Sequence, residues 1–371
     1  MLAEQKAAIL IIVQAGMSPF AWGNPGQGKS ALVRLGFTKL GYAVHVIRVN
    51  TILPHHLGGS PLPHPGGEMV RFVPPEWAVE LNKSEKAVLL LDDLSCATPM
   101  GQMAALGILD ERMIGGFHMN NVIPIAAANP NSVATQRFDL DAAAANRCVH
   151  VFITSDAESF RKDVAAGFPA PIVPVVGKDW KKFVERHSNR ITSFLCSNDG
   201  GGLVKKMPEQ ITPETVAWPS ERTWEKCWQL MAAFDAIDPD SAVGLNMPEV
   251  KRILFRGCVG SGAQKAFVNH FLKPMEASAI DALKQGRHYV FPKEGDKLFG
   301  LLGAVTEKLE AGLDEKKWEQ AWGLLEALFK DGQSDRGITF ALDLLSINKE
   351  RFRKPPFYEQ TIRGLLAAGK K

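Results

Sequence analysis

Short apolar segments recur along the first 155 residues, and stretches with helical spacing separate them. Continuous apolar runs at residues 18–22, 43–49, 87–91, 122–128 and 148–153 predict five strands. Strands without polar alternation are typical of a parallel sheet that is buried on both faces. The alternation of such strands with helical stretches therefore predicts an α/β core in which helices cover a parallel sheet.

From residue 156 onward the strand pattern fades, and apolar residues recur at helical spacing. The helices predicted there are residues 179–198, 221–236, 248–255, 262–275, 296–310, 315–330, 335–347 and 358–368. We expect three domains, namely the α/β core at 1–155, an α-helical lid at 156–275 and a C-terminal α-helical domain at 276–371. The length of 371 residues fits this division, because single hydrophobic cores stop growing at roughly 250–300 residues.

Residues 57–75, inside the core, are dense in glycine and proline and predict a long loop. We expect a hairpin that turns at Gly66 and Gly67. Arg71 and Phe72 near its end would suit a grip on a substrate, because a mobile loop with a cation and an aromatic ring can contact a peptide or a nucleic acid. Packing of Phe72 onto its own domain is the alternative, and the sequence leaves both open.

Composition places the chain among ordinary globular proteins, with 46% hydrophobic and 22% charged residues. A net charge of +3 and a pI near 8.5 do not favour nucleic-acid binding, which usually shows as a strongly basic surface. The five cysteines stand far apart without a CxxC pair, so we expect neither a zinc site nor disulfides, and a cytoplasmic location fits. The apolar run at residues 7–13 is far shorter than the roughly 20 residues of a membrane span, so no membrane partner is expected.

The strongest local signal lies between the first predicted strand and a helix. There the chain satisfies the pattern G-x-x-x-x-G-K-S. The residues of this sequence are Gly23, Asn24, Pro25, Gly26, Gln27, Gly28, Lys29 and Ser30. Its glycines let backbone N–H groups turn toward a phosphate, and the following helix adds a favourable dipole. Lys29 would then contact the β- and γ-phosphates of ATP, and the hydroxyl of Ser30 would ligate Mg²⁺.

A pair of acids follows the strand at 87–91 and supplies the carboxylates that a nucleotide loop needs. Asp92 and Asp93 would stand at the carboxyl edge of the sheet, where open α/β sheets bind their ligands. Asp92 would hold Mg²⁺ through water, and Asp93 would orient or deprotonate the attacking water.

In order and spacing, these motifs resemble those of the MoxR-like AAA+ ATPases. The elements concerned are Walker A at 23–30, Walker B at 89–93, sensor 1 at 128–130 and an arginine-finger segment at 140–147. Residues 57–75 resemble the family's insertion in the second helix. The resemblance covers about residues 1–155 well and implies a P-loop AAA+ core. It also implies a homo-hexameric ring that hydrolyses Mg-ATP to remodel a protein, often together with a von Willebrand factor A domain protein.

Three further residues are candidates for the reaction. Asn129 ends the strand at 122–128, where its amide could hold the attacking water or contact the γ-phosphate, although an Asn-Pro turn is the plain alternative. Arg147 corresponds to the arginine finger that acts on a neighbouring subunit, with Arg137 as a competing candidate. A surface pair of Arg147 with Asp141 is the alternative. Arg222, in the first turn of a helix that Ser220 would cap, resembles sensor 2, and a merely solvated arginine is its alternative.

One departure from the family concerns Asp93, because glutamate is usual at that position. A catalytic group misplaced by about 1 Å can cost on the order of 10²-fold in rate, so slow hydrolysis is expected. Two other functions therefore stay open beside the remodelling ATPase. One is a nucleic-acid-directed AAA+ machine, such as a clamp-loader or helicase relative, and the other is a nucleotide-gated scaffold that turns ATP over slowly.

Overall fold

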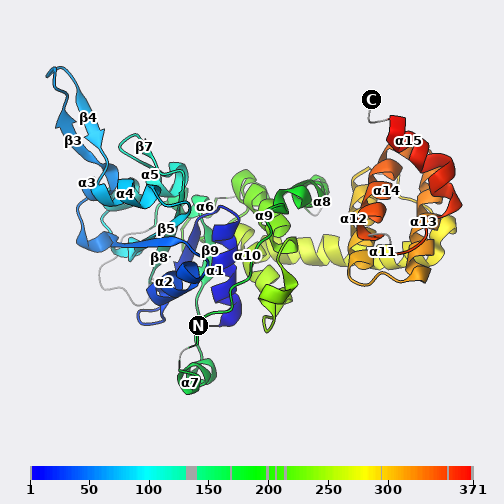
Figure 1. The fold of residues 1–371 in the computed structure, drawn as a ribbon, viewed down its shortest axis with the longest axis horizontal. Coiled ribbons are helices and arrows are strands. Elements are labelled where there is room, and N and C mark those ends of the chain that lie inside the picture. Colours follow the sequence, from blue (N-terminus) through cyan, green and yellow to red (C-terminus); the bar gives the residue numbers. More distant parts are fainter. Residues whose placement is uncertain are drawn as a thin grey trace. The chain divides into compact units, whose positions relative to one another are not determined.

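The computed structural model describes residues 2–130, 140–167, 169–197, 200–204, 207–212, 215–293, 295–348 and 351–368. The chain forms two compact units. The first consists of Met1–His187 and Leu203–Gln264, and the second of Ser188–Gly202 and Lys265–Lys371 (Figure 1). Each unit thus contains two separate stretches of the sequence. The division into 1–155, 156–275 and 276–371 stays a prediction.

A five-stranded parallel sheet in the order β2-β5-β8-β1-β9 forms the centre of the first unit. The strands are β1 (Pro19–Trp22), β2 (Ala43–Arg48), β5 (Ala87–Asp92), β8 (Val122–Ala128) and β9 (Val149–Phe152). Every residue of β1 and β5 is buried, as the continuous apolar runs predicted. The five predicted strands and the α/β class are therefore confirmed, with strand ends shifted by at most one residue.

Helices cover this sheet. α1 (Ala3–Gln14) contacts β1 and β9, while α2 (Lys29–Lys39) contacts β2 and β5. α5 (Pro99–Glu111) packs on β8 and on α6 (Ala142–Arg147). Alternate residues of a strand point to the same face of the sheet, and Leu89 and Leu91 of β5 pack with Ile108 of α5 in one hydrophobic cluster. Because helices pack on the faces of the sheet, a ligand can reach side chains only at the ends of its strands.

The glycine- and proline-rich insertion forms the predicted hairpin. Strand β3 (Ser60–Pro63) pairs with β4 (Val70–Val73) in antiparallel register, and the connection spans residues 64–69. Pro61 lies opposite Phe72, and the hairpin projects from the α/β core (Figure 1). Phe72 keeps an exposed fraction of 55%, although its Cβ approaches Gly115. A grip on a substrate and packing onto its own domain both stay open for Phe72, because its Cβ lies against the domain while much of the side chain is exposed.

The first unit contains further short elements and the helices that follow the sheet. They are α3 (His55–Gly58), α4 (Glu76–Asn82), β6 (Met113–Ile114), β7 (Phe117–His118), α7 (Ala157–Ala165), the start of α8 (Val184–Cys196), α9 (Glu221–Asp235) and most of α10 (Met247–Ala266). Gly260 interrupts α10 with a φ of 81°, a value that favours glycine. No helix in the described ranges has the length and apolar character needed to cross a bilayer.

The second unit is helical and has its own core. A π-helical turn (Phe267–Leu272) leads into α11 (Lys273–Gln285), α12 (Gly295–Glu310), α13 (Glu315–Lys330), α14 (Ser334–Asn348), a second π-helical turn (Tyr358–Ile362) and α15 (Arg363–Ala368). The end of α8 belongs to this unit, because Phe194 is fully buried against Phe267 and Phe271. Trp318 and Trp322 are core residues, which is the usual role of such stripes.

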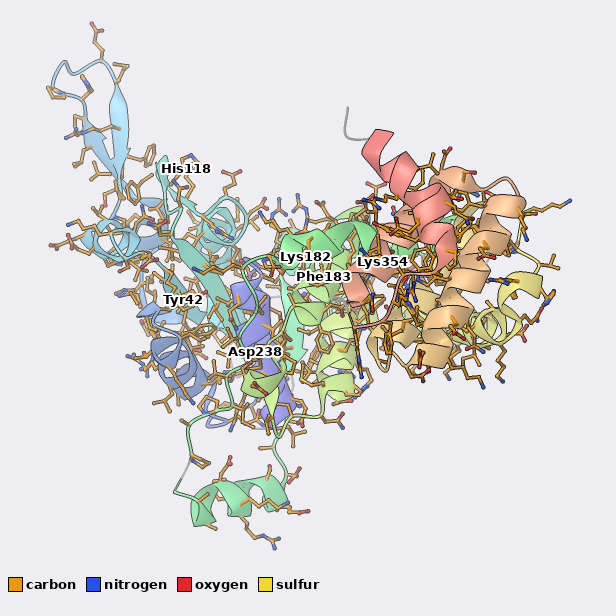
Figure 2. The ribbon with its side chains drawn as sticks, turned by 45° about the vertical axis from the view of Figure 1, so that its right-hand side comes forward. Tyr42, His118, Lys182, Phe183, Asp238 and Lys354 are labelled. Carbon is orange, nitrogen blue, oxygen red and sulfur yellow. The ribbon has the colours of Figure 1, made fainter. Side chains whose placement is uncertain are left out.

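Several aromatic rings at the surface are covered by lysines of the same unit. Lys86 Nζ lies 4.8 Å from the centre of the Tyr42 ring, and Lys182 Nζ lies 4.9 Å from that of Phe183 (Figure 2). Cation–π pairs of this kind are ordinary features of protein surfaces. These lysine and aromatic neighbours therefore give no separate indication of a nucleic-acid surface.

Candidate functional site

The glycine-rich loop connects β1 to α2 and turns sharply. Gly26 and Gly28 have φ angles of 80° and 78°, and Gly28 is the N-cap of α2. A Cβ at Gly23 would lie 2.7 Å from the side-chain oxygen of Gln27 and 3.0 Å from Cβ of Ile153. The left-handed backbone favours glycine at Gly26 and Gly28, and a side chain at Gly23 would crowd Gln27 and Ile153. A strand, this loop and a helix together constitute a P-loop.

Lys29 is buried at the start of α2 and holds the loop. Its Nζ donates to the carbonyl oxygens of Gly23 at 2.6 Å and Asn24 at 3.2 Å, and to Oδ1 of Asn129 at 2.9 Å. Burial lowers the pKa of Lys29, and the neighbouring aspartates oppose that shift. The ammonium group is thus fixed at the inner side of the loop, where it can contact a phosphate.

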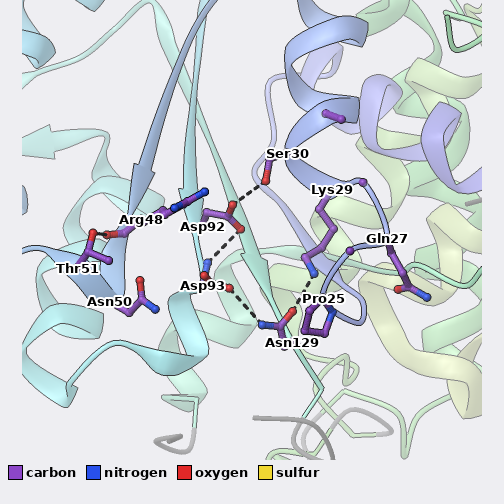
Figure 3. Close-up of a pocket in the computed structure, with 13 residues that line it drawn as sticks. Pro25, Gln27, Lys29, Ser30, Arg48, Asn50, Thr51, Asp92, Asp93 and Asn129 are labelled. Atoms are coloured by element: carbon purple, nitrogen blue, oxygen red, sulfur yellow. Dashed lines mark hydrogen bonds between the residues drawn. The ribbon is translucent and has the colours of Figure 1, made fainter. Parts of the chain in front are cut away.

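Ser30 and Asp92 are the oxygen ligands available for a cation. Ser30 Oγ donates to Oδ2 of Asp92 at 2.6 Å, and the backbone N–H of Asp93 donates to Oδ1 of Asp92 at 3.1 Å (Figure 3). A hydroxyl and a carboxylate in contact are the donors that Mg²⁺ prefers, since it usually keeps several waters and takes one or two protein carboxylates. The pair therefore fits the expected metal.

Asn129 joins the lysine to the second aspartate. Strand β8 lies between β1 and β5, so the residue after β8 stands between the P-loop and the acids that end β5. Asn129 Nδ2 donates to Oδ1 of Asp93 at 3.2 Å, while its Oδ1 accepts from Lys29 (Figure 3). The contacts fix the orientation of the amide and bring Asn129 together with Lys29 and Asp93.

A cavity of about 620 Å³ opens beside these side chains. It is lined by residues 25–31 of the P-loop and α2, by Asp92, Asp93 and Asn129, and by three residues that the motifs did not indicate. These three are Arg48, which ends β2, and Asn50 and Thr51, which follow it. A signal for them existed in the sequence, because all parallel strands present their carboxyl ends at one edge of the sheet and β2 was among the predicted strands.

A second cavity of about 520 Å³ reaches the same loop from another direction. Its walls combine residues 24–28 with the apolar side chains of Leu35 and Phe160 and with Pro169 and Pro171. Lys6 and Asp163 also line it, and they form an ion pair with an N–O separation of 3.8 Å. The P-loop therefore borders two cavities, a charged one at Asp92 and Asp93 and a more apolar one at Leu35 and Phe160.

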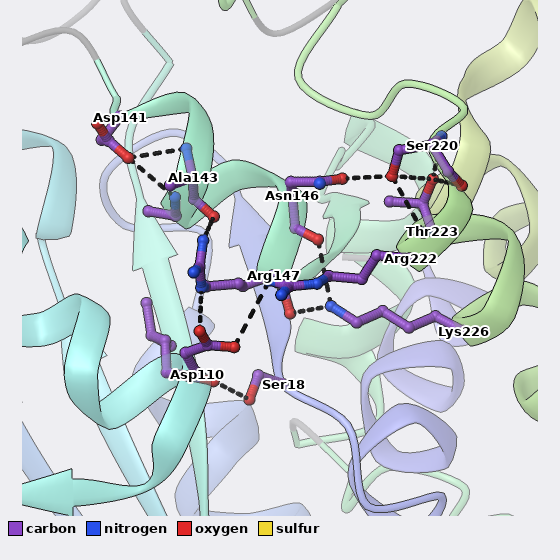
Figure 4. Close-up of polar contacts among 12 residues, drawn as sticks. Ser18, Asp110, Asp141, Ala143, Asn146, Arg147, Ser220, Arg222, Thr223 and Lys226 are labelled. Carbon is purple, nitrogen blue, oxygen red and sulfur yellow. Dashed lines mark hydrogen bonds and ion pairs between the residues drawn. The ribbon is translucent and has the colours of Figure 1, made fainter. Parts of the chain in front are cut away.

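Arg147 and Arg222 lie together, outside the lining of both cavities. Arg147 Nε lies 2.5 Å from Oδ2 of Asp110, and Arg222 Nη1 lies 3.6 Å from its Oδ1 (Figure 4). Asp141, the partner considered for Arg147, instead caps α6 by accepting from the N–H groups of Ala143 and Ala144. Asp110 was not anticipated as their shared partner. Arg137 lies outside the described residues.

Comparisons with known proteins add little to this geometry. No protein-family model and no curated protein matches the chain. Among solved structures, a protein from Cytophaga hutchinsonii named as a candidate ATPase is similar over 68% of this chain and 80% of its own. The sequence identity is 17% and the TM-score is 0.39, values at which the likeness indicates neither a family nor an activity.

Proposed function

We propose that this protein is an AAA+ ATPase similar to the MoxR group, which hydrolyses Mg-ATP at subunit interfaces of a ring and remodels a protein partner. The hydrogen-bonded group of Lys29, Ser30, Asp92, Asp93 and Asn129 beside the P-loop is the observation that carries this proposal. These residues combine a phosphate ligand, two cation ligands, a candidate base and a water-orienting amide at one sheet edge.

Each of these side chains has a defined task in hydrolysis. The N–H groups of the P-loop and Lys29 bind the β- and γ-phosphates. Mg²⁺ held by Ser30 and Asp92 would supply neutralisation of the phosphate oxygens. Asp93 accepts a proton from the attacking water or orients it, and Asn129 holds that water beside the γ-phosphate. The apolar cavity at Leu35 and Phe160 suits the base of the nucleotide.

Two substitutions test the nucleotide site. Asp93→Asn removes the candidate base but keeps the cation ligands, so it should bind ATP as the wild type does and lower turnover by about 10² or more. Lys29→Ala should weaken ATP binding itself. Nucleotide titration and steady-state phosphate release separate the two effects. Unchanged turnover in Asp93→Asn would show that Asp93 is not the base, and negligible turnover in the wild type itself would favour the nucleotide-gated scaffold.

The shared position of Arg147 and Arg222 supports a joint action on the nucleotide of a second subunit. Mixing variants tests it. Lys29→Ala subunits keep both arginines, and Arg222→Ala subunits keep a complete P-loop, so the mixture should recover turnover that neither variant shows alone. Arg147→Ala mixed with Lys29→Ala is the matched experiment for the arginine finger. Recovery only in the Arg147 mixture would assign Arg222 to its own subunit, and no recovery in either would contradict the shared site.

The exposed hairpin supports a protein as the partner that is remodelled, and the resemblance adds a von Willebrand factor A domain protein. Pro61, Pro63, Val70 and Phe72 form opposed pairs on one face of the hairpin, where apolar side chains suit a polypeptide better than a phosphate backbone. Phe72→Ala should abolish remodelling and spare ATP hydrolysis. Loss of both activities would favour the packing role of Phe72, and stimulation of hydrolysis by DNA would favour the nucleic-acid-directed machine.

A further inference from the structure

Arg48 ends β2, the edge strand of the sheet, beside the strand that carries the two acids. β2 and β5 are parallel, and their register places Arg48 opposite Asp92. Ile47 and Leu91, the residues before them, also lie opposite each other, and both belong to the hydrophobic cluster that β5 forms with α5. Because successive residues of a strand point to opposite faces, Arg48 and Asp92 project together from the other face. On that face Ser30 of α2 donates to Asp92.

A tight turn after β2 fixes the backbone of Arg48 at the cavity beside the P-loop. Residues Val49–Thr51 form a single 3₁₀ turn, in which Val49 is buried in the core of the first unit. Thr51 Oγ1 donates to the carbonyl oxygen of Arg48 at 2.9 Å. Asn50 and Thr51 line the same cavity as Arg48. The position of the arginine is therefore set by packing and by a hydrogen bond, while its side chain is exposed.

The guanidinium group of Arg48 is available to a ligand of this cavity. Among the described residues of the lining, the charged ones are Lys29, Arg48, Asp92 and Asp93. Lys29 approaches from the side of the P-loop, where three acceptors hold it, and Arg48 approaches from the side of β2 (Figure 3). The Asp92 oxygens already accept from Ser30 and from the N–H of Asp93. Within the described ranges, the Arg48 guanidinium has neither a hydrogen bond nor an ion pair.

We propose that Arg48 binds the γ-phosphate of ATP in its own subunit and makes the site prefer ATP to ADP. The four charges of the lining cancel, whereas a triphosphate carries more negative charge than one Mg²⁺ neutralises. The N–H groups of the P-loop hold the β-phosphate, so the γ-phosphate extends along the sheet edge toward the acids and Arg48. A guanidinium group can donate to two phosphate oxygens at once. ADP has no phosphate there and gains nothing from Arg48. The inference rests on the proposed ATPase and adds the residue that distinguishes its two nucleotides.

Titration of the full chain with ADP and with a non-hydrolysable ATP analogue, each with Mg²⁺, tests this role. Arg48→Ala should raise the dissociation constant of the ATP analogue by about tenfold and that of ADP by less than about twofold, because only the analogue loses a charge-assisted hydrogen bond. Arg48→Lys keeps the charge but not the planar group of donors, so it should raise the dissociation constant of the analogue by about threefold.

Arg34→Ala is the matched control, because Arg34 is an exposed arginine of α2, which packs on β2, and lines neither cavity. It should leave both dissociation constants within about twofold of the wild type. Unchanged affinity for the analogue in Arg48→Ala would mean that the arginine is merely solvated, and equal weakening for both nucleotides would mean a structural role. Either result overturns the proposal for Arg48. The nucleotide site itself would still be supported if the wild type binds the analogue and Lys29→Ala does not. A wild type that binds neither nucleotide would overturn both proposals.

Discussion

Asp93 adopts a left-handed backbone conformation with a φ of 57° and at the same time accepts a hydrogen bond from Asn129. Aspartate and asparagine tolerate that conformation better than most residues do. The residue therefore combines a backbone requirement with its candidate role as a base. Its short side chain restricts how far the carboxylate extends toward a water at the γ-phosphate.

The variant Asp93→Glu tests whether this reach limits hydrolysis. Glutamate adds one methylene, and correcting a misplacement of about 1 Å can change a rate by on the order of 10²-fold. We expect turnover to rise while ATP affinity stays unchanged, as measured by phosphate release under saturating nucleotide. An equal or lower turnover would mean that side-chain length is not the limitation.

His150 is a buried histidine with a fixed tautomer. Trp22 Nε1 donates to its Nδ1 at 3.0 Å, which leaves Nε2 to donate to the carbonyl oxygen of Ala145 at 2.9 Å. Burial lowers the pKa of His150 to about 4. The unfolded chain thus binds a proton at a higher pH than the folded chain does.

The free energy of unfolding should consequently fall as the pH decreases from about 6.5 to about 4. A shift of this size corresponds to a loss of about 3 kcal/mol. His150→Gln removes the titrating group, so its denaturant midpoint should depend less steeply on pH in this window, whatever its stability at pH 7. Parallel pH profiles for the two proteins would show that another group is responsible.

Among the site residues, those in continuous motifs could be predicted and those defined by distant contacts could not. The P-loop, Asp92 and Asn129 follow predicted strands directly, so the parallel sheet brings them together. Asp110 was missed because its relation to Arg147 and Arg222 depends on the packing of three helices. The spacing of apolar residues predicts which face of a helix is buried, but it does not predict which side chain pairs with an exposed acid.

At the scale of elements, helix α10 approaches strand β9 of the sheet closely at Gly257. A Cβ there would lie 2.4 Å from the carbonyl oxygen of His150 and 3.1 Å from Cγ1 of Val149. Backbone atoms of β9 cannot move aside as a flexible side chain could. Gly262, which follows the interruption of α10 at Gly260, has no atom within 4 Å of a Cβ.

These two glycines form a matched pair of substitutions. Gly257→Ala should destabilise the first unit by about 1–3 kcal/mol, because overpacking outweighs the gain in helix propensity. Gly262→Ala should stabilise it by about 0.5–1 kcal/mol. Denaturant midpoints of the two variants give the comparison, and a loss of stability in both would indicate that α10 tolerates no change of backbone flexibility.

The sequence predicts an element well where all of its residues are buried to a similar degree. Strands β1 and β5 are buried on both faces and so appear as continuous apolar runs, whereas α10 and α11 were not separated correctly. The predicted helix at 262–275 spans the end of α10, the π-helical turn and the start of α11. Apolar spacing continues across these boundaries because the side chains continue to pack, although the backbone conformation changes.

At the scale of the whole molecule, the two units should unfold separately. ATP at about 100 times its dissociation constant should stabilise the first unit by about 2.7 kcal/mol and leave the second unchanged. Phe194→Ala removes a fully buried ring of the second unit, at a cost of about 3–5 kcal/mol. Calorimetry should show that this variant lowers only the transition that ATP does not shift. A single transition that responds to both would contradict independent units.

The discontinuous second unit has a consequence for synthesis of the chain. Phe194 is fully buried in this unit, yet the whole segment Leu203–Gln264 leaves the ribosome before its partners Phe267 and Phe271 do. At a translation rate of roughly 5–20 residues per second, the apolar end of α8 stays without its packing partners for some seconds. A nascent chain stalled in that interval offers a hydrophobic target to holding chaperones, and synonymous codons that slow the ribosome there would lower the yield of folded protein.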